Sequence, residues 1–236
     1  IWLGLVGSEM CIRDSIIGLK SEVFTQFVNS LSSNILDISP SCMLHPNILK
    51  NFEKNKNALI TKNNVKVVAE FKASTKPNYS KQTLALVSGI DFINDKNLEE
   101  EIFGPFSLLV ECENMTQLKS VIKHINGQLT GTILATNNEI LKNKDLIDIL
   151  KERVGRIIFN GVPTGVEVSP SMLHGGPYPA STDSRFTAVG IKSIDRWVRP
   201  LSYQDFPNEL LPDSLKNNNP KNILRLVNGV YTKNKI

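Results

Sequence analysis

Strand-like and helix-like segments alternate along the middle of the chain, and this alternation sets narrow limits on the fold. Between residues 107 and 159, three runs typical of strands are separated by two segments with apolar residues at helical spacing. The strands are at 107–112, 129–135 and 156–159, and the helices are at 114–125 and 138–154. Such alternation is typical of an α/β layer with a largely parallel sheet. We therefore predict an α/β fold in which helices flank a largely parallel sheet.

Elements of both kinds are predicted on either side of this region. On the N-terminal side they are strands at 16–19, 65–71 and 83–90 and helices at 21–31, capped by Ser21, and at 47–60. On the C-terminal side they are a helix at 189–198, an edge strand at 201–203 and a weak helix at 222–227. Gly155 is expected to end the helix before it as a C-cap.

Composition excludes several classes of protein. Of the 236 residues, 41% are hydrophobic and 21% are charged, and no apolar run approaches the roughly 18 residues of a membrane span. The net charge of +4 comes from lysines spread along the chain, so we expect no nucleic-acid partner and no membrane partner. The three cysteines form no CxxC pair, which favours a reducing, cytoplasmic setting, and the three histidines are too dispersed for a local metal motif.

The first fifteen residues do not fit a folded domain. The apolar run of residues 1–6 has no basic residue before it and no cleavage site after it, so it is a poor signal peptide. The string also resembles translated adapter sequence. We therefore expect residues 1–15 to be a non-native leader and the chain to be a fragment without its native N-terminus.

The segment Glu100-Glu-Ile-Phe-Gly-Pro105 combines a carboxylate, an aromatic ring and a turn. An ionised carboxylate at Glu101 can accept hydrogen bonds from both hydroxyls of a ribose, and Phe103 offers a flat face to a planar ring. Gly104-Pro105 would fix the backbone that directs both side chains. The alternative, which the spacing alone favours, is a solvated charge run followed by two core residues.

A long loop at 160–179, with four glycines and four prolines, contains the second distinctive segment, His174-Gly-Gly-Pro-Tyr-Pro179. A loop of this length within a compact domain is usually functional. Its paired glycines permit close backbone approach, and its prolines stiffen the chain. On its own, however, the segment is better explained as a tight structural turn.

The cysteines offer weaker candidates. Cys42 and His45 are three residues apart and could form a thiolate dyad, but both lie between prolines with no third group to orient the histidine. A surface loop with an idle cysteine is the simpler interpretation. Cys112 alternates with apolar residues along one strand face, which indicates a buried hydrophobic side chain.

Taken together and in this order, these motifs resemble the C-terminal part of the aldehyde dehydrogenase superfamily. Glu100-Glu-Ile-Phe-Gly-Pro105 matches a specific signature of that family, and Gly175-Gly176 lies where the family has its late Gly-Gly turn. The stretches Asn160-Gly-Val-Pro-Thr-Gly-Val-Glu-Val168, His174-Gly-Gly-Pro-Tyr-Pro179 and Ile194-Asp-Arg-Trp-Val-Arg-Pro200 are similar to the branch of 2-oxoglutarate semialdehyde and NADP-dependent fatty-aldehyde dehydrogenases. The resemblance extends from Ile16 to Pro220.

The resemblance implies a set of roles. Glu101 and Phe103 would bind the nicotinamide ribose and ring of NAD(P), with the choice between NAD and NADP left open. The substrate contacts would be Thr164, Val166, Val168 and His174, where the histidine replaces the aromatic residue usual in the superfamily. The nucleophilic cysteine of the family falls near position 10, and Cys11 lacks the matching neighbours, so no catalytic residue and no metal ligand is assigned.

The resemblance also implies an incomplete aldehyde dehydrogenase catalytic-domain fold over residues 16–175, followed by a C-terminal helix and oligomerisation tail over 176–236. The expected activity of the intact protein is oxidation of an aldehyde, such as 2-oxoglutarate semialdehyde, to a carboxylate through a cysteine thioester. The fragment itself is expected to be inactive, and the full-length protein to be a homo-oligomer. The alternative is a non-catalytic paralogue that keeps the fold for oligomerisation or binding.

Overall fold

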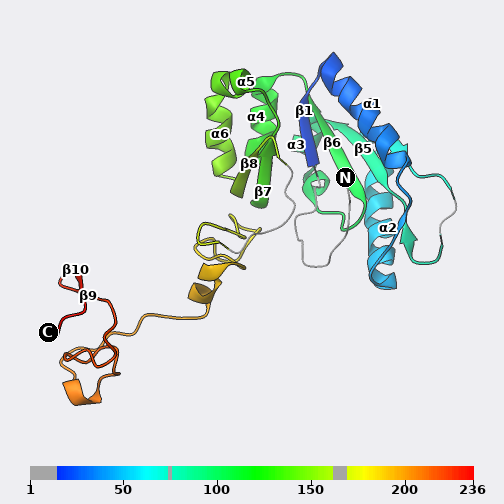
Figure 1. Ribbon diagram of the computed structural model, residues 1–236. Helices are drawn as coiled ribbons and strands as arrows, with labels where there is room; N and C mark the ends of the chain where they lie inside the picture. Colours follow the sequence, from blue (N-terminus) through cyan, green and yellow to red (C-terminus); the bar gives the residue numbers. More distant parts are fainter. Residues whose placement is uncertain (1–14, 74–75, 162–168) are drawn as a thin grey trace. The chain divides into compact units, whose positions relative to one another are not determined.

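A computed structural model describes residues 15–73, 76–161 and 169–236 of the chain (Figure 1). These residues belong to two compact units, one that ends at Arg196 and one that runs from Trp197 to Ile236. Within the described ranges, no helix is both long and apolar enough to cross a bilayer.

The first unit is built on a four-stranded sheet. Its strands are β1 (Ser15–Leu19), β6 (Phe106–Cys112), β5 (Thr83–Ser88) and β3 (Lys66–Glu70), in that spatial order. The β1–β6 and β6–β5 pairs are parallel, and β3 joins β5 in an antiparallel pair with a register shift. The predicted largely parallel sheet is therefore confirmed, with one antiparallel strand at its edge.

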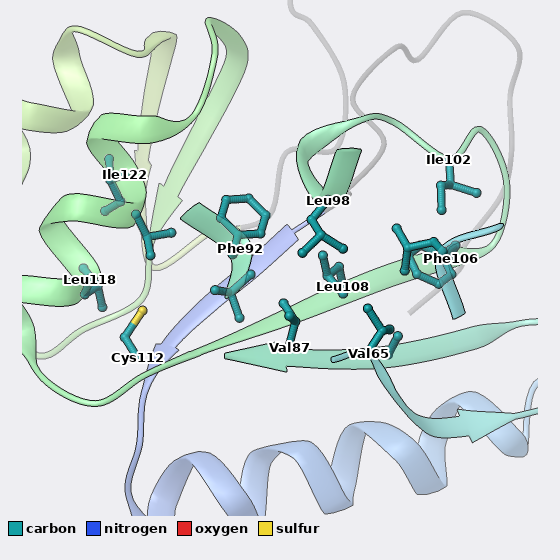
Figure 2. Packing of buried hydrophobic residues seen from close by; sticks show 14 of the residues in the cluster. Val65, Val87, Phe92, Leu98, Ile102, Phe106, Leu108, Cys112, Leu118 and Ile122 are labelled. Atoms are coloured by element: carbon teal, nitrogen blue, oxygen red, sulfur yellow. The ribbon is translucent and has the colours of Figure 1, made fainter. Parts of the chain in front are cut away.

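Helices cover both faces of this sheet. On one face, Phe24 and Val28 of α1 (Glu22–Leu36) pack against Leu84 and Leu109 of the central strands. On the other face lies a larger core, to which α2 (Pro46–Ile60), α3 (Gly89–Asn94) and α4 (Met115–His124) all contribute side chains. Figure 2 shows part of this larger core, which lies on the face of the sheet opposite α1. The arrangement matches the predicted α/β layering.

The strands that the sequence assigned to one layer belong to two sheets. Strands β7 (Gln128–Ile133) and β8 (Val154–Phe159) pair in parallel with each other in a separate two-stranded sheet. The single helix predicted at 138–154 is two helices, α5 (Asn137–Lys142) and α6 (Lys144–Lys151). They separate at Asn143, whose side-chain amide donates to the carbonyl of Glu139 (2.9 Å) and competes with the helical backbone pattern.

Gly155 is not the C-cap that its sequence position suggested. It lies inside β8, and Glu152 caps α6 three residues earlier. The remaining short elements of the first unit are β2 (Ser41–Cys42) and β4 (Tyr79–Ser80), which pair with each other, and the 3₁₀ turns η1 (Lys96–Glu99) and η2 (Ile191–Arg196). The helix predicted at 189–198 is thus a 3₁₀ turn.

The second unit contains the turn η3 (Asn208–Leu210) and a hairpin of β9 (Arg225–Val227) and β10 (Val230–Thr232). The helix predicted at 222–227 and the strand predicted at 201–203 are both wrong. Asn228 and Gly229 connect the hairpin with φ angles of 48° and 82°. Two consecutive positive φ angles are the geometry of a tight hairpin turn, for which Asn-Gly is the preferred sequence.

Candidate functional site

The Glu100–Pro105 segment connects η1 to the first residue of β6, and its side chains point in opposite directions. Ile102 is buried, and with Phe106 it belongs to the large core shown in Figure 2. Glu101 is exposed, and 52% of the Phe103 surface is accessible. Neither sequence interpretation holds completely: Ile102 is a core residue, whereas its neighbours Glu101 and Phe103 are both exposed.

The turn at Gly104-Pro105 is fixed from two sides. Gly104 has a φ of +156°, and a Cβ at this position would lie 2.3 Å from Cδ2 of Phe52 in α2. On the other side, the backbone N–H of Thr83 in β5 donates to the carbonyl of Pro105 (3.0 Å). Only glycine allows the chain to pass this close to the Phe52 ring. The backbone under Glu101 and Phe103 is therefore held by both a helix and the sheet.

The acidic run before the turn is not uniformly solvated. The Glu99 side chain is 6% exposed, accepts a hydrogen bond from the backbone N–H of Asn126 (3.1 Å) and lies 3.7 Å from Nε2 of His124. Glu100 and Glu101 are exposed. One carboxylate thus attaches the run to the segment after α4, and Glu101 is left accessible as an acceptor.

His174 is largely buried, and its backbone is fixed by two hydrogen bonds. Its N–H donates to Oγ1 of Thr187 (2.9 Å), and its carbonyl accepts from the N–H of Ala188 (2.9 Å). Burial lowers the pKa of the His174 imidazole, and the positive charge of Arg156 lowers it further. The ring is therefore neutral near pH 7, and a neutral imidazole can both donate and accept a hydrogen bond.

The two glycines after His174 pack backbone to backbone on the small sheet. A Cβ at Gly155 of β8 would lie 1.8 Å from the carbonyl oxygen of Gly175, and one at Gly176 would lie 2.4 Å from that of Gln128. Tyr178-Pro179, which follows, is a cis peptide bond. The interpretation as a tight structural turn accounts for the glycines, and it leaves the role of the His174 side chain open.

One short segment contacts the residue just before the first motif and a residue of the second. The N–H of Asn126 binds Glu99, beside the Glu101 turn, and the N–H of Gly127 donates to the carbonyl of Tyr178 (3.3 Å), beside His174. Within the described residues, no hydrogen bond or ion pair joins Glu101 or Phe103 directly to His174. The other three predicted substrate contacts, Thr164, Val166 and Val168, lie outside the described residues.

Of the two cysteine candidates that lie within the described residues, the Cys42–His45 dyad is absent and Cys112 is buried. Nδ1 of His45 caps α2 by accepting from the N–H of Asn47 (3.1 Å), while the Cys42 thiol faces the Met43 carbonyl (3.5 Å) and the Asn78 amide (3.6 Å). The Cys42–His45 dyad is therefore not formed. Cys112 is fully buried, as predicted, and Cys11 lies outside the described residues. Across the described ranges, no group of three or more His, Cys, Asp or Glu side chains is placed to hold a metal ion.

Sequence reasoning missed Lys56, a lysine of α2 that is 3% exposed. Its Nζ lies 2.9 Å from Glu53 and 3.2 Å from Glu70, and 5.4 Å from the centroid of the Phe52 ring. A signal was present, because Lys56 lies four residues after Phe52 and three before Leu59, on the apolar stripe of the helix. A lysine at such a position is expected to need buried partners.

Comparisons with known proteins agree on one family. The chain is 40% identical over 233 residues to an alpha-ketoglutaric semialdehyde dehydrogenase of Acinetobacter baylyi, a match that covers 96% of the chain and 43% of that relative. It matches the crystal structure of lactaldehyde dehydrogenase from Escherichia coli with a TM-score of 0.62 and 18% identity, over 79% of the chain and 38% of that structure. No protein-family model matches the chain.

A second solved structure adds to the fold match. It is succinic semialdehyde dehydrogenase from Streptococcus pyogenes, crystallised with NADP⁺, with a TM-score of 0.54 and 17% identity over 69% of the chain and 36% of that structure. These two structural matches show a shared fold. The chain spans less than half the length of each of these three proteins.

Proposed function

Because the chain belongs to the aldehyde dehydrogenase superfamily, we propose that it is the C-terminal part of an NAD(P)-dependent enzyme that oxidises 2-oxoglutarate semialdehyde to the dicarboxylate. The observation that carries this proposal is the outward-facing Glu101–Phe103 pair on a turn that Phe52 and Thr83 hold in place. The substrate assignment is supported by 40% identity to the Acinetobacter relative over 96% of the chain.

The residues of the turn fit a nicotinamide cofactor. Glu101 is accessible and its carboxylate can accept both hydroxyls of a ribose, while the exposed ring of Phe103 offers a face to a planar group. When bound, the cofactor supplies the hydride-accepting chemistry. Glu101 and Phe103 would orient the nicotinamide of the cofactor. A displacement of the reacting groups by about 1 Å can reduce the rate on the order of a hundredfold.

At the substrate end, we propose that the neutral imidazole of His174 donates a hydrogen bond to the aldehyde substrate, together with Thr164, Val166 and Val168. A neutral histidine keeps a donor available without placing a second positive charge beside Arg156. We propose that none of the chain's cysteines is the nucleophile. Cys112 is buried, His45 is occupied as a helix cap rather than serving Cys42, and Cys11 lacks the neighbouring residues of the family motif. We therefore expect the chain by itself to have no dehydrogenase activity.

The proposal extends to setting and assembly. Residues 176–236 are proposed to supply subunit contacts of a homo-oligomer. The thiols of Cys42 and Cys112 are free, which supports a cytoplasmic setting. NAD and NADP both satisfy the contacts proposed for Glu101 and Phe103.

The experiment is Glu101→Gln in the complete protein that contains this chain. Because the amide loses the charge and half of the acceptor capacity, we expect the KM for the cofactor to rise at least tenfold while the KM for the aldehyde is unchanged. Steady-state kinetics with both NAD⁺ and NADP⁺ measure this. Glu100→Gln is the matched control, an exposed carboxylate one residue away that should leave both constants unchanged.

Equal cofactor KM values in Glu101→Gln and the parent protein would remove the cofactor role of the turn. If the complete protein turned over no aldehyde at all, the non-catalytic paralogue would be the correct interpretation. Turnover by the 236-residue chain alone would contradict the proposal that none of its cysteines is the nucleophile.

A further inference from the structure

The Gly104-Pro105 turn belongs to a cyclic series of contacts between α2, β3 and β5. Phe52 packs against Gly104, the Thr83 N–H binds the Pro105 carbonyl, and the Thr83 hydroxyl donates to Glu70 (3.3 Å). Lys56 completes the series, since its ammonium group binds Glu70 and lies over the ring of Phe52. Gly104 is therefore connected to Lys56 through Phe52, and Pro105 is connected to Lys56 through Thr83 and Glu70.

The burial of Lys56 needs an explanation beyond packing. Desolvation of an ammonium group is costly unless it is paired, and a well-packed apolar side chain of similar shape is often as stable or more so. Lys56 is 3% exposed, whereas its partners Glu53 and Glu70 are 37% and 34% exposed, so the cation is the buried member of both pairs. Buried ion pairs of this kind can fix one geometry where apolar packing would allow several.

We propose that Lys56 is a positioning residue for the cofactor, because it fixes both Phe52 and Thr83 and so holds the turn that directs Glu101 and Phe103. This inference rests on the cofactor role proposed for that turn. Among the described residues, no hydrogen bond, ion pair or ring contact joins Lys56 to Glu101 or Phe103. Lys56 acts through the Phe52 ring on one side and through Glu70 and Thr83 on the other.

The test is Lys56→Met in the complete protein, since methionine keeps the length and apolar stem of the side chain and removes the cation. We expect the cofactor KM to rise about tenfold with no change in the aldehyde KM, because loss of the ion pairs lets the turn move by a fraction of the 1 Å that costs about a hundredfold. A purely structural role would reduce the folded fraction and hence kcat, and would leave both KM values alone. Lys50→Met, an exposed lysine of the same helix, is the matched control.

Three further measurements separate positioning from stability. Lys56→Arg retains the charge and should keep the cofactor KM near that of the parent protein. Thr83→Val removes the hydroxyl group, and with it the bond to Glu70 (3.3 Å) and the longer one to the carbonyl of the neighbouring Lys81 (3.5 Å). It should raise the cofactor KM about threefold, even if Lys56→Met folds poorly. Without cofactor, hydrogen exchange at the Thr83 N–H should become faster in Lys56→Met, because that group binds the Pro105 carbonyl.

The outcomes are distinct. A folded Lys56→Met protein with unchanged cofactor KM and unchanged exchange at Thr83, alongside a raised KM in Glu101→Gln, would overturn the role of Lys56 alone. An unchanged KM in Glu101→Gln would overturn the cofactor site and this inference with it. If both variants raise the cofactor KM, the Lys56→Met/Glu101→Gln double variant should show less than the product of the single effects, as expected for two residues that act through one turn.

Discussion

At Gly104, residue type and local geometry can be connected directly. Its φ of +156° and the Phe52 ring 2.3 Å from a virtual Cβ leave room only for hydrogen at this position. The Gly-Pro dipeptide predicts a turn from sequence, but nothing in the sequence identifies Phe52, 52 residues earlier, as the ring that the turn packs against. The constraint on the turn was thus predictable, and its physical source was not.

Cys112 shows how burial controls a side chain's chemistry. Burial, helped by the negative charge of Glu111, raises the pKa of the Cys112 thiol to about 11. At pH 8 its thiolate fraction is then on the order of one in a thousand, and the thiolate is the reactive form. We expect iodoacetamide to label Cys42 and to spare Cys112 in the native protein, with both labelled after unfolding. Peptide mass spectrometry of the two states measures this.

The same shift predicts a pH dependence of stability. The ordinary thiol pKa is 9.0, so between pH 9 and about pH 11 the unfolded chain ionises Cys112 while the folded chain does not. The unfolded state then binds fewer protons, and the free energy of unfolding falls as pH rises, by at most about 1.4 kcal/mol per pH unit. Cys112→Ala should lack this contribution. In the iodoacetamide experiment, equal labelling of Cys42 and Cys112 in the native protein would show that the Cys112 thiol is not shielded.

At the scale of elements, periodicity predicted most of the first unit correctly. Residues with strand-like alternation became β1, β3, β5, β6, β7 and β8, because each can bury one face or both against a helix. What periodicity could not show is which strands pair. Strands β6 and β7 are consecutive strands in the sequence yet belong to different sheets, because β6 fills the centre of its sheet between β1 and β5.

The two errors have different causes, one local and one distant. The helix predicted at 222–227 rested on a few apolar residues, whereas Asn228-Gly229 immediately after it is a strong hairpin signal that outweighs so short a pattern. Gly155 was assigned as a cap because glycine commonly follows helices, but its actual requirement is the carbonyl of Gly175, a residue 20 positions later. A contact between distant segments, rather than the end of a helix, therefore explains the glycine at position 155.

The packing of Gly155 on Gly175 leads to a test of the late loop. Gly155→Ala would place a methyl group 1.8 Å from a backbone oxygen, which cannot rotate away, so we expect a loss of about 3 kcal/mol in stability. Because Gly175 follows His174, the aldehyde KM of the complete protein should rise as well. Urea denaturation and steady-state kinetics measure the two effects.

Gly131→Ala is the matched control in the neighbouring strand β7. A Cβ there would meet only side-chain atoms of Leu150 and Val154, at 3.0 Å, and these can shift by a few tenths of an ångström. We expect a loss below about 1 kcal/mol and an unchanged aldehyde KM. Equal effects of the two substitutions would show that the Gly155–Gly175 contact has no special role.

For the whole molecule, the two motifs found in the sequence account for only part of the candidate site. Glu101, Phe103 and His174 were identifiable because glycine and proline frame them. The Asn126-Gly127 segment, which binds beside both motifs, carries no such signal, since it contributes backbone N–H groups rather than side chains. Contacts made by backbone groups become visible only in three dimensions, whereas the buried Lys56 had a sequence signal in its position on the apolar stripe of α2.

The second unit leads to the last prediction. Nine of its large apolar side chains are at least 60% accessible within the chain: Trp197, Val198, Leu201, Leu210, Leu224, Leu226, Val230, Tyr231 and Ile236. A concentration of exposed apolar residues in so short a segment is typical of an interface. We expect termination of the complete protein after Arg196 to convert a homo-oligomer into smaller species, measured by size-exclusion chromatography with light scattering.

A subtler variant separates surface chemistry from loss of the unit. Leu226 and Tyr231 are directly opposite each other in the β9–β10 hairpin, so Leu226→Ser/Tyr231→Ser removes one apolar patch and keeps the backbone. This variant should weaken assembly in the same direction as the truncation, because association buries apolar surface at roughly 25 cal/mol per Å². Lys233→Ser, on the same hairpin, should not. If the truncated protein kept its full assembled mass, the subunit contacts would have to lie in the first unit or outside this chain.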